Sequence, residues 1–517
     1  MFAFIKRNSW FIILWICFVI HFSHVNAQNW PKIYGDDIHA YVRRTIEDYD
    51  KGYIIGGSVL SDPNTLRYAW IIKADINGTE LWNKKFGNGI DQFFLQSCAK
   101  MEDSGIVICG GTTIEDPQYD PLFFKLNICG ELEWCKIFLS DGHNEATDLI
   151  AIEDGYIGLL KYYDGGPQYF RISLVKMDPS GEPIWIQHLA QEDSLIYNEE
   201  ADYLYRTSDS HYLVSGECFH PGLKPYWITT DTSGIQMWDL MWQGGIGGAY
   251  QVIESNNGYF YSVGGLASTG MPITPVLFKL SNDGDAIYSE YLMGDTIDGG
   301  GAVSLCQYND SILLTGIIWG GQPDPDIEYY SEIFMLDTLG NILNKKLLLN
   351  QAHAPQNIIR TFDDKIIVSG HYVVDNNWDI YMWKLNSDLE IDTLYTQPLT
   401  YDSLCPYQIL SDTVDLDCSL FVNIDEIPTK EEYESTIKIS PNPAVDWIAL
   451  TLPDNVSSGN IELAIYNIFG QEVMKTSVVP QNRTVSLNIS NLESGFYLAV
   501  CKDAKRKVFK GKFIVAR

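Results

Sequence analysis

Residues 52–87 read GYIIGGSVLSDPNTLRYAWIIKADINGTELWNKKFG and contain the two phrases that decide the fold. The first phrase, GYIIGGS at 52–58, is a short run of β-branched and aromatic residues interrupted by glycines, as in a buried strand. The second phrase, at 69–87, has two strand-like runs around a turn. Because Asp75 can hydrogen-bond within this turn and Gly78 accepts a positive φ, the phrase predicts a β-hairpin.

Both phrases recur through most of the chain. Copies of the first phrase follow one another at intervals of 48–56 residues, and a copy of the second follows each of them. No segment of helical period lies between the copies. Aligned on glycine, the first phrase falls at Gly57, Gly110, Leu160, Gly216, Gly264, Gly316 and Gly370, and the turn of the second at Gly78, Gly130, Gly181, Gly234, Gly284, Gly340 and Leu389.

This periodicity predicts an all-β fold. Residues 28–400 hold seven repeats of about 52 residues, enough for four short strands each, as in propeller blades of roughly 40–50 residues. We therefore expect a seven-bladed β-propeller. The strand-like run at 30–35 has no complete phrase before it and can close the ring by completing the last blade. Because the seventh copy has a corresponding run at 391–395, eight blades or an irregular closure also stay open.

The turn of the second phrase resembles motifs of two propeller families. Residues 74–82 partly match the tryptophan-docking motif of quinoprotein propellers, and the Gly-x-x-x-Trp part recurs at Trp134, Trp185 and Trp238. Residues 178–185 partly match the Asp-box turns of sialidase-type propellers. In both families these turns mainly hold blade to blade, so the resemblance implies packing rather than cofactor binding.

Composition and the first residues indicate where the protein goes. With 35 Lys and Arg against 67 Asp and Glu, the net charge of -32 repels phosphate backbones, which excludes nucleic acid as a partner. Residues 1–27 combine Lys6 and Arg7 with an apolar run and end in Ala27, as in a signal peptide. The apolar run is shorter than the roughly 20 residues of a membrane span, and we expect no transmembrane segment after cleavage.

Six cysteines are candidates for disulfides in the oxidising compartment that a signal peptide implies. Cys98 and Cys109 flank one predicted hairpin turn, and Cys129 and Cys135 flank another. Cys405 and Cys418 could close a small loop, although spacing alone does not prove any of these pairings. A zinc site is disfavoured because no C-x-x-C pair occurs.

No motif identifies a catalytic, cofactor-binding or metal-binding residue. A nucleophile elbow, a P-loop, an H-E-x-x-H helix and an EF-hand loop are all absent from the sequence. The acidic loop at 324–328 could suit calcium, but it lacks the glycine of an EF-hand loop and is better explained as a solvated loop. Aromatic residues in or near loops are the candidates for ligand contact: Trp242, Trp319, Tyr329, Tyr330 and Trp378.

The C-terminal region has a different pattern. Residues 401–436 lack the repeat and are predicted to be a linker, while alternating apolar positions in 437–517 predict a small Ig-like antiparallel β-sandwich. The motifs of this second segment are PNP at 441–443, YNIFGQEV at 466–473, SGFY at 494–497 and KGKFIV at 510–515.

These motifs, in this order, closely resemble the type A C-terminal sorting domain of the Bacteroidetes type IX secretion system. The resemblance implies export across the inner membrane by the signal peptide into the periplasm, and then across the outer membrane through contact with the secretion machinery. The protein is then expected on the cell surface or in the medium. The matching residues that we expect to form the sorting motif and its turns are Pro443, Gly470, Gly495, Tyr497 and Lys512.

Three functions are compatible with these features. The first is an extracellular binding module whose propeller holds a glycan or a protein, which fits the abundant aromatic residues and the lack of a catalytic motif. The alternative is a secreted enzyme that degrades polysaccharide or peptide, with its site in the propeller channel. The third is a passive structural component of the cell surface.

Overall fold

The computed structural model describes residues 30–517 in part. The gaps are 36–38, 61–65, 115–117, 140–141, 164–169, 190–196, 221, 268–271, 294–298, 321–329, 351–353, 375–376, 417, 419–420, 425–426, 428, 430–435, 454–455, 457–458, 469–470 and 504–507. The predicted signal peptide and the acidic loop at 324–328 therefore lie outside the described residues. In the described part of the chain, no helix is long and apolar enough to cross a membrane.

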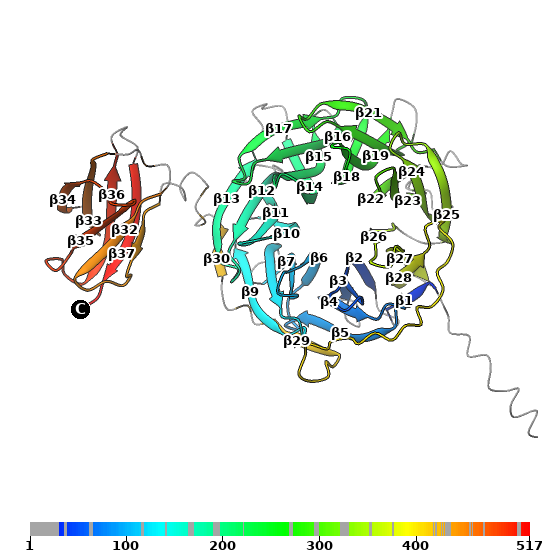
Figure 1. Ribbon diagram of the computed structural model, residues 1–517, viewed down its shortest axis with the longest axis horizontal. Helices are drawn as coiled ribbons and strands as arrows, with labels where there is room; N and C mark the ends of the chain where they lie inside the picture. Colours follow the sequence, from blue (N-terminus) through cyan, green and yellow to red (C-terminus); the bar gives the residue numbers. More distant parts are fainter. Residues whose placement is uncertain are drawn as a thin grey trace, which may run out of the picture.

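Every regular element that the structure describes is a β-strand, and the strands between Lys32 and Asn423 form seven sheets arranged in a ring (Figure 1). We number the sheets as blades along the chain, each with its first strand innermost and its last outermost. This arrangement confirms the predicted all-β propeller fold.

Blade 1 contains β2 (Ala40–Glu47), β3 (Tyr53–Leu60), β4 (Arg67–Ala74) and β5 (Glu80–Gly87). Blade 2 contains β6 (Phe93–Lys100), β7 (Ile106–Thr112), β8 (Asp120–Leu126) and β9 (Leu132–Leu139). Blade 3 contains β10 (Glu145–Ile152), β11 (Gly155–Tyr163), β12 (Phe170–Met177) and β13 (Pro183–Leu189). Blade 4 contains β14 (Tyr197–Arg206), β15 (Tyr212–Phe219), β16 (Leu223–Thr230) and β17 (Gln236–Met241). Blade 5 contains β18 (Ile246–Glu254), β19 (Phe260–Ala267), β20 (Thr274–Leu280) and β21 (Ala286–Tyr291). Blade 6 contains β22 (Gly300–Asn309), β23 (Ile312–Trp319), β24 (Tyr330–Asp337) and β25 (Ile342–Asn350). Blade 7 contains β26 (Asn357–Arg360), β27 (Ile366–Val374), β28 (Asn377–Leu385) and, from the other end of the chain, β1 (Lys32–Tyr34).

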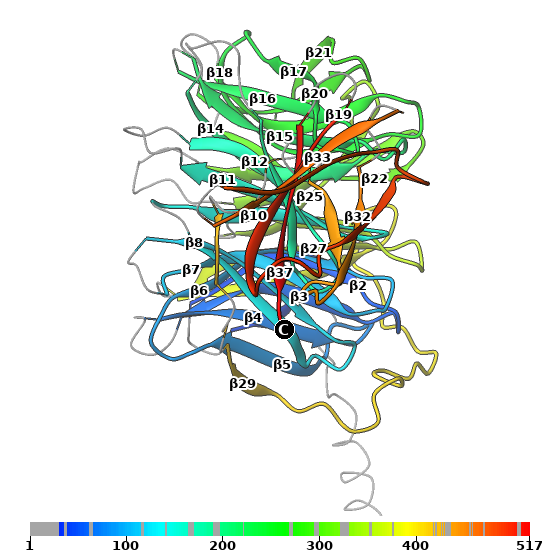
Figure 2. The same ribbon diagram turned by 90° about the vertical axis from the view of Figure 1, so that its left-hand side faces the viewer.

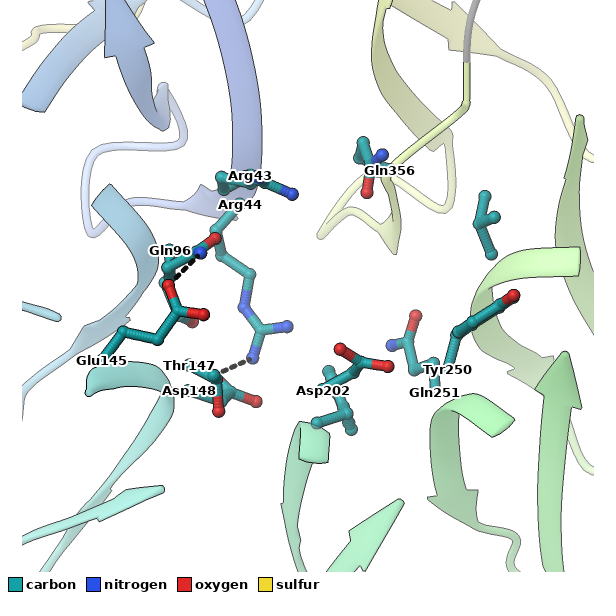
Figure 3. Close-up of a pocket in the computed structure, with 13 residues that line it drawn as sticks. Arg43, Arg44, Gln96, Glu145, Thr147, Asp148, Asp202, Tyr250, Gln251 and Gln356 are labelled. Carbon is teal, nitrogen blue, oxygen red and sulfur yellow. Dashed lines mark hydrogen bonds and ion pairs between the residues drawn. The ribbon is translucent and has the colours of Figure 1, made fainter. Parts of the chain in front are cut away.

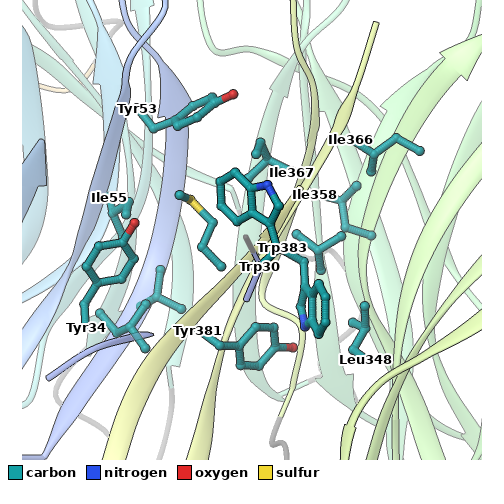
Figure 4. Close-up of a cluster of buried hydrophobic side chains, with 14 of the residues drawn as sticks. Trp30, Tyr34, Tyr53, Ile55, Leu348, Ile358, Ile366, Ile367, Tyr381 and Trp383 are labelled. Carbon is teal, nitrogen blue, oxygen red and sulfur yellow. The ribbon is translucent and has the colours of Figure 1, made fainter. Parts of the chain in front are cut away.

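The ring closes at blade 7. Strand β1 pairs antiparallel with β28, with Ile33 opposite Tyr381, so the strand-like run at 30–35 completes the last blade as expected. The competing run at 391–395 forms only an isolated bridge between Leu385 and Ile391, because β1 already occupies the outer position. A buried cluster fills the joint, with Trp30 and Tyr34 from the N-terminal segment packed among residues of blades 1, 6 and 7 (Figure 4).

Neighbouring blades are joined by tryptophans that pack on turn glycines. Gly78 has a φ of +74°, and a Cβ there would lie 2.7 Å from the ring of Trp30. Four further turn glycines also have positive φ and face the tryptophan of the preceding blade. These pairs are Gly130 with Trp82, Gly181 with Trp134, Gly234 with Trp185, and Gly284 with Trp238. The Gly-x-x-x-Trp pattern is therefore a blade-to-blade contact, and glycine fits because of both its φ and the lack of room.

Residues 401–429, which we call the strap, do not form the linker that the sequence predicts. Strand β29 (Asp412–Asp415) pairs parallel with β5, and β30 (Phe421–Asn423) pairs parallel with β9 (Figure 1; Figure 2). Further along, Thr429 forms a parallel bridge to Ile186 of β13. The prediction was wrong because the outermost strands of blades 1 to 3 expose unpaired backbone groups, and the strap satisfies part of them.

Two disulfides tie the strap to blade 2. Cys129 pairs with Cys405 and Cys135 with Cys418, with Cα–Cα distances of 5.6 and 5.0 Å. The pairings expected from sequence were therefore wrong, although four of the six cysteines do form disulfides. Cys98 and Cys109 are free and buried. Cys98 lies opposite Ile108, and Cys109 lies opposite Ser97. This offset of one residue sends the two thiols to opposite faces of the sheet.

The C-terminal domain is the predicted antiparallel sandwich. Its first sheet contains β31 (Lys438–Ser440), β32 (Trp447–Thr451) and β35 (Thr484–Asn488), and its second contains β34 (Glu472–Val478), β33 (Ile461–Asn467), β36 (Gly495–Lys502) and β37 (Val508–Val515). Apolar side chains from both sheets form one buried core that includes Ile448, Ile465 and Phe513. The alternation of apolar residues that predicted the domain thus marks its inner faces.

We predict that the disulfides hold the strap on the ring. The double variant C129S/C135S should have a lower melting temperature than the wild type and a strap that trypsin or thermolysin cleaves readily, because loss of a native disulfide typically costs about 2–5 kcal/mol. The matched control is C306S, which alters a free cysteine. Differential scanning calorimetry and limited proteolysis check this. Equal protease resistance in all three proteins would contradict it.

Candidate functional site

In six of the seven blades, one bulged residue of the innermost strand lines the central channel. The innermost strands of blades 1 to 6 each have a register shift, and the residue that the shift leaves unpaired lines one cavity in the channel (Figure 3). A bulge redirects a side chain out of the alternation of its strand. The bulge ring, as we call it, consists of Arg43, Gln96, Thr147, Asp202, Tyr250 and Val303, completed by Gln356 just before β26 in blade 7.

The repeat glycine makes room for this bulge. A Cβ on Gly57, Gly110, Gly216 or Gly264 would lie 1.8–2.0 Å from a carbonyl oxygen of the adjacent innermost strand. Only glycine allows so close an approach of two backbones. In blade 6 the residue opposite Ala302 is Ile317, so the sequence alignment on Gly316 is one residue out of register there.

In several blades, a polar side chain next to the bulge ring accepts a hydrogen bond from the backbone of a neighbouring blade. Asp148 Oδ2 accepts a hydrogen bond of 2.9 Å from the backbone N–H of Leu204 in the next blade. Gln251 Oε1 does the same for Leu305 at 2.8 Å. Asn357 Oδ1 accepts from Thr45 at 3.1 Å, which links blade 7 to blade 1. These polar side chains therefore join blades, and Asp148 and Gln251 also line the cavity.

The cavity has a volume of about 420 Å³ and is lined by both arginine and acidic side chains. Blade 1 contributes Arg43 and Arg44, while blades 3 and 4 contribute Glu145, Asp148 and Asp202 (Figure 3). The Arg44 guanidinium lies 3.7 Å from Asp148 and over the ring of Tyr203 at 5.0 Å.

Two charged side chains of the bulge ring, Arg43 and Asp202, have no ion-pair partner among the described residues. Gln96 Nε2 donates to Glu145 Oε2 at 3.1 Å, so the Glu145 carboxylate is already engaged by the wall. Among the described residues, Arg43 and Asp202 each have no oppositely charged atom within 4.0 Å. A guanidinium and a carboxyl are thus left facing the cavity, where a ligand could use both.

The carboxyl group of Asp202 is set up to exchange a proton near neutral pH. Its side chain is open to the solvent of the channel, yet the blades enclose it on all sides. This enclosure, followed by the negative charges of Glu217 and Glu200, raises the pKa of Asp202 to about 7. The same enclosure raises the pKa of Tyr250 to about 12. At neutral pH, Asp202 can therefore donate or accept a hydrogen bond.

One aromatic residue predicted to face a ligand packs against the innermost strand of blade 1 but does not line the cavity. Trp378 is half-buried, with ring centroids 5.5 Å from Tyr41, two residues before Arg43, and 5.2 Å from His371. Trp319 is buried and donates to Glu332, Tyr330 stacks on Trp319, and Trp242 packs on Phe278; Tyr329 lies outside the described residues.

The sequence contains a signal for the bulge ring that motif analysis missed. Five of its members lie 14 residues before a repeat glycine: Arg43, Gln96, Asp202, Tyr250 and Gln356. Knowledge that the glycine accommodates a bulge would have pointed to these positions. The residue types vary from blade to blade, so no ordinary motif reveals them. In the described ranges, no group of three or more His, Cys, Asp or Glu side chains is placed to hold a metal ion.

The residues expected to form the sorting motif gather around β37. Gly495 pairs with Val515, and Lys512 is exposed opposite Leu498. Tyr497 lies opposite Phe513, with stacked rings 5.5 Å apart, and its hydroxyl donates to the carbonyl of Glu493. Pro443 is exposed and precedes Ala444, which bridges to β37, whereas Gly470 lies outside the described residues.

Comparison with known families identifies the C-terminal domain. Residues 438–516 match the family described as the secretion system C-terminal sorting domain. The match confirms the sorting domain of a type IX secretion substrate and indicates export to the cell surface or the medium. No curated protein matches the chain.

Solved structures with similar folds include three distant examples. One is a protein of unknown function from Bacteroides caccae (12% identity, 48% of this chain and 80% of that chain, TM-score 0.32). Another, also of unknown function, is from Dyadobacter fermentans (11%, 70% and 98%, TM-score 0.39). The third is the β-propeller domain of the Trilobed protease from Pyrococcus furiosus (9%, 69% and 99%, TM-score 0.38). We draw no functional conclusion from these likenesses.

We predict that Asp202 makes stability depend on pH. Because its folded-state pKa lies above the value of about 3.9 in an unfolded chain, the protonated group stabilises the fold at acid pH. This contribution is lost as the pH rises through about 7. The D202N variant should therefore gain melting temperature over the wild type at pH 8, and less at pH 5. D283N, in an exposed turn, is the control. An equal difference at both pH values in calorimetry would refute the assignment.

Proposed function

We propose that the exported propeller is an extracellular binding module that holds the end or a branch of a glycan in its central channel. The observation that carries this proposal is the bulge ring, which presents amide, hydroxyl, carboxyl and guanidinium groups to one cavity. Its volume of about 420 Å³ falls within the roughly 300–1,000 Å³ of small-molecule sites.

The chemistry of the wall favours a glycan over a protein. Gln96 and Gln356 can each donate and accept through one amide, and Tyr250 can do so through a hydroxyl, whereas the Thr147 hydroxyl oxygen is buried. Sugars present hydroxyls that need both kinds of partner. A folded protein could reach this wall only with a terminus or a single side chain, because the blades surround the cavity.

The second candidate is an enzyme that degrades polysaccharide or peptide at the same site. Asp202, with a pKa of about 7, could act as a general acid opposite carboxylates of blade 3. We rank this function second because Asp148 is paired with Arg44 and Glu145 accepts from Gln96, so both carboxylates have partners in the wall. Release of new reducing ends or amines from a bound polymer would favour it.

The binding proposal predicts the effect of removing two amide side chains from the bulge ring. The variant Q96A/Q356A should lose at least about tenfold in affinity for a glycan selected on an array, because about 1 kcal/mol is lost with each hydrogen bond. Q307A, outside this cavity, is the matched control and should bind as the wild type does. Isothermal titration calorimetry measures both. A blank array, or unchanged affinity in Q96A/Q356A, would count against binding in the channel.

The export route predicts a separate result in cells. We propose that the signal peptide carries the chain into the periplasm and that the sorting domain then directs it across the outer membrane. Deletion of residues 437–517 should therefore leave the propeller in the periplasm, while the full chain reaches the surface or the medium. Immunoblots of the three fractions measure this distribution. If both forms distribute alike, the domain does not direct export.

A further inference from the structure

We infer that the glycan held in the channel is acidic and that Arg43 binds its anionic group, a carboxylate or a sulfate. This inference rests on the proposed function and names the class of sugar that the cavity takes. It follows from the distribution of charge in the cavity wall, which leaves one arginine without a partner.

Two other cations near the bulge ring already have carboxylate partners within the protein. Arg44 lies 3.7 Å from Asp148, and Lys161 lies 2.8 Å from Glu200. Among the described residues, Arg43 has no carboxylate within 4.0 Å, although the chain carries 67 acidic residues. Its side chain is exposed and reaches toward the open part of the cavity (Figure 3). A cation left unpaired in so acidic a protein can bind an anion from outside.

The surroundings of Arg43 on blade 1 strengthen the positive charge there. Arg44 follows it directly in the same strand, and Arg67 lies near enough to act on its charge. The Arg67 guanidinium lies over the rings of Tyr41 at 5.9 Å and Phe94 at 5.6 Å. Arg43 and Arg44 both line the cavity, and Arg67 behind them adds to the positive charge on blade 1, although Asp148 lies 3.7 Å from Arg44.

Two aromatic rings outside the lining of the cavity, one on the innermost strand of blade 1 and one on blade 7, favour a sugar as the molecule that carries the anion. Tyr41 and Trp378 are both half-buried, and their ring centroids are 5.5 Å apart with an angle of 33° between the planes. Partly exposed rings of this kind pack against the apolar faces of sugar rings. A saccharide bound through Arg43 would place its neighbouring unit beside these rings. Across the cavity, Asp202 and Gln356 remain for its hydroxyls.

The test compares charged and uncharged forms of the same sugar. Oligogalacturonate, its fully methyl-esterified form and a sulfated oligosaccharide are titrated calorimetrically into the protein of residues 28–517 at low and high salt. We expect an acidic oligosaccharide to bind at least about tenfold more tightly than the ester, since hydrogen bonds to charged groups contribute about 1.5–3 kcal/mol. High salt should reduce this preference. Whichever acidic form binds better identifies the anion.

Variants of Arg43 assign the preference to this side chain. R43Q should bind the acidic form and the ester with similar affinity, and R43K should retain part of the preference for the acidic form. R360Q is the matched control, because Arg360 is exposed and paired with Asp364 outside this cavity. Circular dichroism and melting temperature verify that each variant is folded.

The two proposals fail in different ways. If the ester binds as tightly as both acidic forms, or if R43Q keeps the preference, the inference is overturned. The proposed function still stands in that case, provided that Q96A/Q356A weakens binding. If no oligosaccharide binds and a peptide with a free carboxyl terminus does, both the acidic-sugar inference and the glycan proposal are overturned.

Discussion

In blade 1, the carbonyl oxygen of Tyr41 lies so close to Gly57 that a Cβ on this residue would be only 1.9 Å from it. The same close approach recurs at Gly110, Gly216 and Gly264, each time next to a bulge in an innermost strand. The bulge turns one side chain per blade into the channel. In these four blades the glycine therefore makes room for the bulge that turns a side chain toward the cavity, whereas in blades 3 and 6 Leu160 and Ile317 lie opposite the bulge.

The ring around this channel is closed twice. Strand β1 from the N-terminal side completes blade 7, and its segment adds Trp30 to the series of tryptophans that pack on turn glycines. The strap then runs from the C-terminal side over blades 1 to 3 and is bonded covalently to blade 2 at Cys129 and Cys135. Just before the strap, the backbone of Tyr395 forms two hydrogen bonds with the Asn77 side chain of blade 1, so the chain reaches blade 1 from blade 7 there. A protein exported into an oxidising environment can form the disulfide bonds of the strap, which a reducing compartment would oppose.

The charges that line the channel differ from the strongly acidic composition of the whole chain. The chain has a net charge of -32, yet blade 1 brings Arg43 and Arg44 together at the cavity, where Asp148 lies 3.7 Å from Arg44. Neighbours inside the wall pair with Arg44 and Glu145, which leaves Arg43 and Asp202 for a ligand. A site with one available cation, one carboxyl that changes charge near neutral pH, and several amide and hydroxyl groups suits a polar ligand such as a sugar.

The sequence by itself determined the features that depend on local patterns. The period of the two phrases specified the propeller, since alternation and turn chemistry are read within a few residues, and the tail motifs identified the sorting domain. Tertiary structure alone decided the rest. Cys129 and Cys405 are separated by 276 residues, and each member of the bulge ring comes from a different blade. A linker-like composition also could not show that the strap would pair with exposed strand edges. These outcomes depend on which residues, distant in the sequence, the closed ring brings into contact. A local sequence pattern carries no information about such long-range contacts.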